Sequence, residues 1–200
     1  MYRKDHKDEY YTRRAHKEGY PARSVYKLKE IDEKFRIISK SDKVLDLGSV
    51  PGSWFLYLSQ KVGKEGRVVG IDSEDIKIQI SPNATFIKKD VLTLTPEDIQ
   101  ALGGPFDAVV ADLAPSTTGT TWMDVGKSLE LNEMAFDMAK NVLKTGGNFV
   151  TKIFDGEDVI EFIKAVEGCF QRVKRYRPMA VVKRSREFYL VAMGYDAKRD

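Results

Sequence analysis

The stretch DKVLDLGSVPGSWFLYLSQ, residues 42–60, decides the fold class of this sequence. It predicts a short apolar strand that ends near Asp46, a turn around Gly48 and Gly52, and a helix with Ser53 as its N-cap. A glycine turn between a strand and a helix often holds a nucleotide, because glycine lets a ligand approach the backbone closely. Yet the stretch contains neither G-x-G-x-x-G nor G-K-[ST], the usual dinucleotide and triphosphate motifs.

Strands and helices alternate along the rest of the chain. Further strands are expected at 66–72, 84–90, 105–115 and 148–154, and helices at 22–35, 53–63, 95–104, 124–143 and 155–170. The helix at 124–143 is expected to stop at Lys144–Gly147. Two last β segments, 170–178 and 186–195, are too close together for a crossover helix and must be antiparallel. The pattern predicts an α/β fold with a mostly parallel sheet, helices on both faces and a mixed edge.

Length and composition favour one domain, residues 1–200, without secretion or membrane signals. The N-terminus lacks an apolar signal region, and no run is apolar enough to span a bilayer. The lone Cys169 cannot form an internal disulfide, so we expect a cytoplasmic protein. One Cys and two His cannot build a structural zinc site, and no metal is expected. We also expect a monomer.

Charge is distributed unevenly. Residues 1–29 carry a balance of +5 and residues 172–186 one of +7, although the whole chain carries only +3. Two basic segments at opposite ends of an otherwise acidic chain predict a polyanion-binding face if folding joins them. The basic helical segment 1–35 would form part of it. The alternative is that both segments are merely solvated.

Basic and aromatic side chains alternate near the N-terminus. Tyr10, Tyr11 and Tyr20 could stack on unpaired bases, or they could pack the N-terminal helices onto the sheet. The cations expected beside the binding cleft are Arg3, Lys4, Arg13, Arg14, Lys17 and Arg23.

Charged residues stand at the carboxyl ends of the five predicted strands. In order along the chain they are Asp46, Asp72, Asp90, Asp112 and Lys152. Ligands of such sheets bind beyond these ends, where Asp72 can hold a ribose diol and Asp90 can meet an adenine amino group. An acidic rim disfavours phosphate but suits S-adenosylmethionine, which carries a sulfonium, and Gly48–Trp54 would then hold its methionine end.

Two other interpretations of the acids remain open. Each acid could be a simple helix cap or loop residue. The chain could also be an NAD enzyme, but the turn lacks a third glycine and contains Pro51.

The stretch DLGSVPGSW (46–54) resembles the D-L-G-x-x-P-G-G-[WF] signature of the FtsJ/RrmJ-type (RlmE family) RNA 2'-O-ribose methyltransferases. Segments SVYKL (24–28), ADLAP (111–115), TKIF (151–154) and SREFYLVA (185–192) resemble the same family in order and spacing, from about Arg23 to Tyr195. The resemblance implies a Rossmann-like methyltransferase fold with strand order 3-2-1-4-5-7-6, the last strand antiparallel.

The resemblance also implies the site residues. S-adenosylmethionine would bind at Asp46, Gly48, Pro51, Gly52, Ser53, Trp54, Asp72, Asp90 and Asp112. A K-D-K-E catalytic tetrad falls on Lys27, Asp112, Lys152 and Glu187. Ser53 replaces the usual second glycine and Ser116 the usual asparagine after Ala114-Pro115; neither change removes a charge.

Methyl transfer to a ribose explains why lysines and acids would be needed. A 2'-hydroxyl is a poor nucleophile until its proton leaves, so a general base helps. Lys152 is the candidate base, because burial and a neighbouring cation such as Lys27 favour a neutral amine. Asp112 would orient the ammonium group and contact the cofactor, and Glu187 would hold Lys27 or Lys152. Taken alone, Lys27 and Glu187 could equally be surface charges.

The expected substrate is RNA rather than DNA, because a 2'-hydroxyl is the acceptor. Within RNA, the resemblance favours a uridine of the large-subunit ribosomal RNA or its precursor, and tRNA is the alternative. A methyltransferase acting on a non-RNA acceptor and a catalytically silent RNA-binding module remain less favoured hypotheses.

Overall fold

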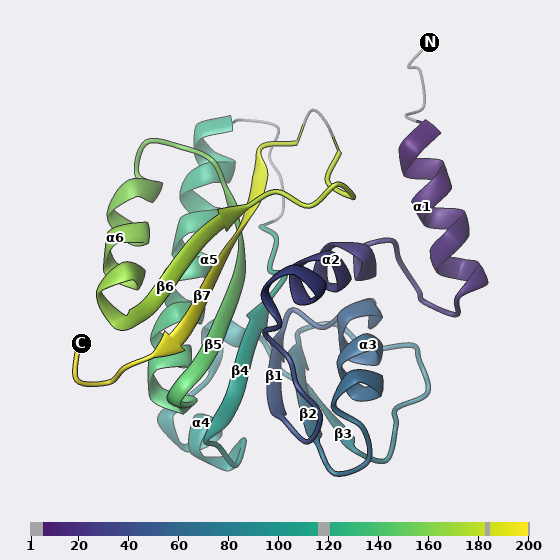
Figure 1. Cartoon of the computed structure of the whole chain (residues 1–200), viewed down its shortest axis with the longest axis horizontal. Coiled ribbons are helices and arrows are strands. Elements are labelled where there is room, and N and C mark those ends of the chain that lie inside the picture. Colours follow the sequence, from purple (N-terminus) through teal and green to yellow (C-terminus); the bar gives the residue numbers. More distant parts are fainter. Residues whose placement is uncertain (1–5, 116–120, 183–184, 200) are drawn as a thin grey trace.

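One seven-stranded sheet organises the chain (Figure 1). The computed structural model describes residues 6–115, 121–182 and 185–199. The strand order is β3-β2-β1-β4-β5-β7-β6, and β7 is antiparallel to both of its neighbours. The strands are β1 (Lys43–Leu47), β2 (Arg67–Asp72), β3 (Ala84–Lys88), β4 (Phe106–Ala111), β5 (Leu143–Phe154), β6 (Phe170–Tyr176) and β7 (Glu187–Tyr195). The predicted α/β class and strand order are confirmed.

Helices cover both faces of the sheet (Figure 1). The helices α2 and α3 pack on one face around Leu28, Phe55 and Tyr189, whereas α4, α5 and α6 pack on the other around Phe136 and Phe149. The helices are α1 (His6–Lys17), α2 (Val25–Phe35), α3 (Ser53–Val62), α4 (Pro96–Ala101), α5 (Thr121–Val142) and α6 (Val159–Cys169), with a short 3-10 turn at Val91–Thr93. Among the described residues, no helix has the length and apolar character needed to cross a bilayer.

Strand alternation sends neighbouring side chains of β5 to opposite faces. Phe149 and Ile153 belong to the core beside α5, and Val150 belongs to the core beside α2. Thr151 therefore faces α5, whereas Lys152 faces the side of α2 and Tyr189.

Two element boundaries differ from the predictions. Gly52, with φ +106°, is the N-cap of α3, and Ser53 is the first helical residue. The Ser53 hydroxyl instead bonds to the backbone of Ala22, which draws it away from capping. The segment Lys144–Gly147 does stop the preceding helix, but it continues β5 rather than forming a loop, with a register break against β4.

The N-terminal helix α1 lies on the α2 and α3 side of the molecule (Figure 1). It packs there through aromatic contacts. Tyr20 is buried and its hydroxyl donates to Gln60, while the Tyr11 ring lies 5.3 Å from that of Tyr26. The Lys29 ammonium lies 4.3 Å from the Tyr20 ring centroid. Of the three tyrosines proposed to stack on bases, Tyr11 and Tyr20 therefore pack against the protein, and only Tyr10 is largely exposed.

Candidate active site

A cleft of about 650 Å³ opens beyond the carboxyl ends of β1, β2 and β4. We call it the acidic cleft, because five carboxylates and one lysine are among its lining residues. Apolar side chains line it between the charges. The carboxylates are Asp72, Glu74, Asp90, Asp112 and Glu130, the lysine is Lys127, and the apolar residues include Val50, Val91, Leu92, Leu113 and Leu131.

Backbone amides of nearby loops hold two of these carboxylates. Asp72 accepts hydrogen bonds from the amides of Val50 and Glu74, at 2.9 and 3.0 Å. Asp90 accepts from the amide of Leu92 at 3.0 Å and caps the 3-10 turn. A carboxylate held by backbone amides keeps a fixed orientation, so both acids present their remaining acceptor capacity to the cleft.

Gly48 shapes the wall of the acidic cleft. Its φ of +77° favours glycine, and a Cβ atom there would lie 2.8 Å from the Leu113 side chain. Leu113 itself follows the end of β4 and lines the cleft. The glycine thus allows the β1 turn and the β4 loop to approach each other closely.

The other residues of the predicted cofactor turn support it from behind. Pro51, Gly52, Ser53 and Trp54 are not among the described lining residues of the acidic cleft. The Trp54 indole donates to the carbonyl of Ser24 at 2.9 Å, and the Ser53 hydroxyl bonds to Ala22. These residues join the turn to the start of α2, whereas Gly48, Asp72, Asp90 and Asp112 line the cleft.

Asp46 lies completely buried at the end of β1. Neither carboxyl oxygen has a hydrogen-bond partner among the described residues. Burial, helped by the nearby charges of Asp112 and Asp72, raises the pKa of Asp46 to about 8. A buried carboxyl without partners is costly in its charged form, so a cationic ligand close to it would be favoured.

The four residues of the predicted tetrad form two ion pairs beside the acidic cleft. Lys27 Nζ lies 2.5 Å from Glu187 Oε1, and both side chains are mostly buried. Lys152 Nζ lies 3.1 Å from Asp112 Oδ1 and donates to the Asp112 carbonyl at 2.9 Å. The structure therefore brings together side chains from α2, the end of β4, β5 and β7.

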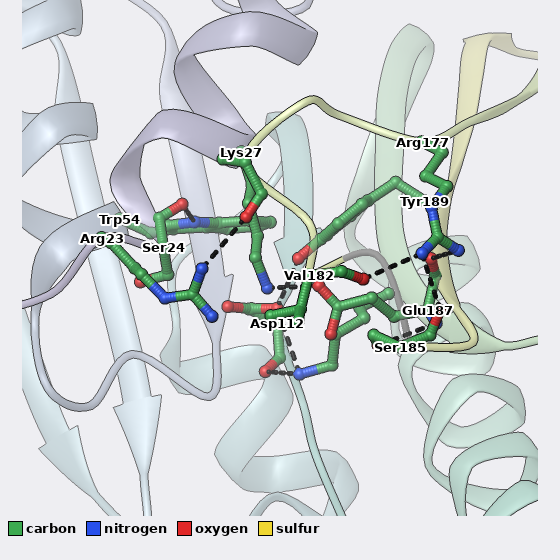
Figure 2. Close-up of polar contacts among 12 residues, drawn as sticks. Arg23, Ser24, Lys27, Trp54, Asp112, Arg177, Val182, Ser185, Glu187 and Tyr189 are labelled. Atoms are coloured by element: carbon green, nitrogen blue, oxygen red, sulfur yellow. Dashed lines mark hydrogen bonds and ion pairs between the residues drawn. The ribbon is translucent and has the colours of Figure 1, made fainter. Parts of the chain in front are cut away.

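Tyr189 connects the two ion pairs, and Figure 2 shows it converging with Lys27, Asp112 and Glu187. Its hydroxyl donates to Asp112 Oδ1 at 2.9 Å, and its ring centroid lies 5.9 Å from Lys27 Nζ. Burial, followed by the charge of Asp112, raises the pKa of Tyr189 well above its ordinary value, so the hydroxyl stays a donor. Strand alternation placed Tyr189 on the same face as Glu187, but no signal in the sequence pointed to a role for it.

The two basic segments meet at this site. Arg23 donates to the carbonyl of Ala180 at 3.3 Å, and Glu30 accepts from the Tyr176 hydroxyl and the Met179 amide, at 2.5 and 2.8 Å. Arg177 donates to the carbonyls of Val182 and Ser185 in the loop before β7 and to that of Glu187 at the start of β7 (Figure 2). Arg3, Lys4, Ser116, Lys183 and Arg184 lie outside the described residues.

A sheet in this order, with an acidic cleft at its carboxyl edge, is the fold of the Rossmann-like methyltransferases. A crystal structure from Plasmodium falciparum, named as a ribosomal RNA methyltransferase, superposes with a TM-score of 0.77 at 24% identity and covers 88% of this chain and 98% of that one. A methyltransferase structure from Streptococcus mutans in complex with SAH gives 0.54 at 17% identity, covering 80% and 90%.

The sequence narrows the class further. The model of the FtsJ-like methyltransferase family matches residues 20–195, and the chain belongs to that family. Proteins named ribosomal RNA large subunit methyltransferase E are similar to it. The one from Desulfatibacillum aliphaticivorans is 46% identical, covering 92% of this chain and 88% of the relative, and one from Nitratidesulfovibrio vulgaris is 43% identical, covering 98% and 100%.

Proposed function

We propose that this methyltransferase transfers a methyl group from S-adenosylmethionine to a ribose 2'-hydroxyl of large-subunit ribosomal RNA, at a uridine. The observation that carries the proposal is the pair of lysine–acid contacts, Lys27–Glu187 and Lys152–Asp112, beside an acidic cleft. The relatives named as large-subunit methyltransferases favour ribosomal RNA over tRNA. The lone buried Cys169 agrees with action in the reducing cytoplasm.

The acidic cleft fits the proposed cofactor. Asp72 is oriented to accept hydrogen bonds from a ribose diol, and Asp90 to accept one from an adenine amino group. Leu92 and Leu113 provide apolar surface for a flat base. When bound, S-adenosylmethionine supplies an activated methyl group. The carboxyls of Asp46 and Asp112 favour its positive charges.

The tetrad would prepare the acceptor oxygen. Lys152 Nζ, which lies beside Asp112, would bind the 2'-hydroxyl and receive its proton after releasing one of its own. Asp112 is fixed in turn by the Tyr189 hydroxyl. Lys27, paired with Glu187, adds positive charge that stabilises the oxygen as it loses its proton. Holding donor and acceptor in line supplies much of the remaining acceleration.

The basic face would bind the RNA backbone. The segments around Arg23 and Arg177 come from opposite ends of the chain and meet beside the tetrad. Phosphate contacts position RNA without reading its sequence, and they make affinity fall steeply with salt. We propose that the protein acts as a monomer of one domain and that α1, with exposed Tyr10 and Arg13, extends this face.

The experiment is methyl transfer from labelled S-adenosylmethionine to total cellular RNA, followed by mapping of the labelled nucleotide. Wild type is expected to label one ribose of the large-subunit RNA, and Lys152→Ala is expected to lose this activity. Lys64→Ala, which changes an exposed lysine between α3 and β2, is the matched control and should remain active. Equal activity of Lys152→Ala and wild type would remove Lys152 as the base.

Other results identify the alternatives. Label in tRNA alone would replace the ribosomal substrate, and label in a protein or small molecule would exclude RNA methylation. RNA binding without any cofactor binding by calorimetry would show a catalytically silent RNA-binding module.

A further inference from the structure

Strand β5 extends past its neighbour at the site. The last paired residues of the parallel β4–β5 ladder are Ala111 and Thr151, yet β5 continues to Phe154. The chain leaves β4 there, and Asp112 and Leu113 turn to line the acidic cleft. Because β4 ends where the chain turns to line the cleft, β5 has no parallel neighbour on that side beyond Thr151.

The missing strand would leave two backbone groups of β5 without partners. The amide of Asp112 bonds to Leu47 of β1, so the next residue, Leu113, would have turned its backbone toward β5. In a continued parallel ladder, Leu113 would pair with both the carbonyl of Lys152 and the amide of Phe154. Unpaired backbone groups in a buried strand are costly, so another partner is needed.

Two side chains of α5 replace the missing strand. Asn132 Nδ2 donates to the Lys152 carbonyl at 2.9 Å, and the Phe154 amide donates to Ser128 Oγ at 3.3 Å. Ser128 and Asn132 are four residues apart and share one face of the helix. The Asn132 amide thus takes the place of the Leu113 N–H group, and the Ser128 hydroxyl takes the place of the Leu113 carbonyl.

Asn132 is fixed in this position by its own contacts. It is 1% exposed, its second amide hydrogen reaches the Ser128 carbonyl at 2.6 Å, and its oxygen accepts from the Thr151 hydroxyl at 2.5 Å. Both hydrogens and the oxygen of the side-chain amide are therefore used. A fully bonded buried amide specifies a single arrangement of the groups around it.

We propose that Asn132, assisted by Ser128, is a positioning residue that sets the place of Lys152 by holding its backbone from the opposite face of the sheet. The inference rests on the proposed function of Lys152. It explains how β5 holds Lys152 Nζ 3.1 Å from Asp112 Oδ1 at a point where β4 no longer pairs with β5. Asn132 contacts the backbone of Lys152, so its effect on the reaction passes through Lys152.

The test compares two side-chain amides that each donate to two carbonyls, the buried Asn132 and the partly buried Asn83, by substitution to leucine. Asn132→Leu is expected to lower kcat by about 10- to 100-fold, the range for a small misplacement of a catalytic group. The KM for RNA and the Kd for S-adenosylmethionine should stay near wild type. Asn83→Leu is the matched control, because Asn83 also donates to two carbonyls. These are the carbonyls of Ser59 and Gly63 at the C-terminal end of α3. Its kcat should be unchanged.

Combination with Lys152→Ala shows whether the effect passes through the lysine. If it does, Asn132→Leu lowers the residual rate of Lys152→Ala no further. A full additional loss in that background, or wild-type kcat in Asn132→Leu, would overturn the inference. If Asn132→Leu does not fold, the inference is tested with Ser128→Ala instead. This variant is expected to lower kcat by a smaller factor and to leave KM unchanged.

Amide hydrogen exchange separates this inference from the proposed function. Exchange in the segment 152–154 should become faster in Asn132→Leu and remain slow in Asn83→Leu, whether or not the protein methylates RNA. Unchanged exchange there would contradict the support of Lys152 by Asn132. A wild-type protein without methyl transfer would contradict the proposed function, but faster exchange would still support the anchoring of β5.

Discussion

The acidic cleft and the tetrad share Asp112 but are built in different ways. In the cleft, Asp72 and Asp90 are each held by an amide two residues further along the chain. In the tetrad, Lys27 and Glu187 meet across 160 residues, and Lys152 and Asp112 across 40. Local turn chemistry thus orients two acids of the cleft, whereas the tetrad exists only once the whole sheet has assembled.

This difference predicts two kinds of response to mutation. A change in the cleft should alter ligand affinity and leave the rate at saturation intact. A change at Lys27, Lys152 or Glu187, the tetrad residues that do not line the cleft, should alter the rate, and often stability, without altering cofactor affinity. The predictions below follow from this contrast.

The largest effect is expected for Lys152→Met, which keeps most of the side-chain volume but removes the amine. We expect kcat to fall by about 10²- to 10⁴-fold, the usual contribution of a general base. Calorimetry should give a Kd for S-adenosylmethionine close to that of wild type, since Lys152 is not among the residues lining the cleft. A large change in that Kd would show that the cleft and the tetrad are not separable.

The ion pair of Lys27 and Glu187 should couple activity to stability. Lys27→Met leaves a mostly buried carboxylate without its partner and is expected to lower the free energy of unfolding by about 3 kcal/mol. The double variant Lys27→Met/Glu187→Leu should recover most of this loss and remain inactive. Urea unfolding measures the stabilities. Equal losses in the single and double variants would mean that the pair does not act as a unit.

The same contrast explains how far the sequence could be interpreted. Glycines, strand-end acids and the apolar runs are local signals, so a mostly parallel sheet with a mixed edge and an acidic rim could be predicted, whereas the strand order came from the resemblance to a family. Strand alternation also placed Glu187 and Tyr189 on one face. The tetrad came only from the resemblance to a family, because no local pattern links Lys27 to a residue 160 positions away.

The errors also have physical causes. Ser53 has the composition of an N-cap, but a tertiary bond to Ala22 uses its hydroxyl. The contact of Trp54 with the cofactor stays a prediction; in the structure its indole bonds to Ser24 and its ring packs against Tyr189. Asn132 gave no signal, because the need for it arises only where β4 ends and β5 continues.

A smaller effect is expected for Asp72→Asn in the acidic cleft. The variant removes the charge and one acceptor from a side chain that bonds to Val50 and Glu74. The Kd for S-adenosylmethionine should rise by about 10- to 100-fold, as for the loss of a hydrogen bond to a charged group. The kcat at saturating cofactor should be unchanged. A large fall in kcat would show that Asp72 also orients the methyl group.

The smallest effect concerns the pH dependence of stability and compares two acids beside the same turn. Asp72 has two amide donors, whereas the buried oxygens of Asp46 have no partner among the described residues. Burial raises the pKa of Asp46 to about 8 from an ordinary 3.8, so between these values the folded chain holds a proton that the unfolded chain has lost. Folding then takes up a proton, and stability falls as pH rises through this window.

The variant Asp46→Asn cannot titrate and should lack this contribution. Between pH 5.5 and 7.5, wild type should lose up to about 1.4 kcal/mol per pH unit relative to Asp46→Asn, measured by urea unfolding without ligand. Above the pKa of about 8, the difference should become constant. Parallel stability curves would mean that the Asp46 carboxylate is as well accommodated as that of Asp72. In that case the contrast between a partnered and an unpartnered acid at this turn would fail.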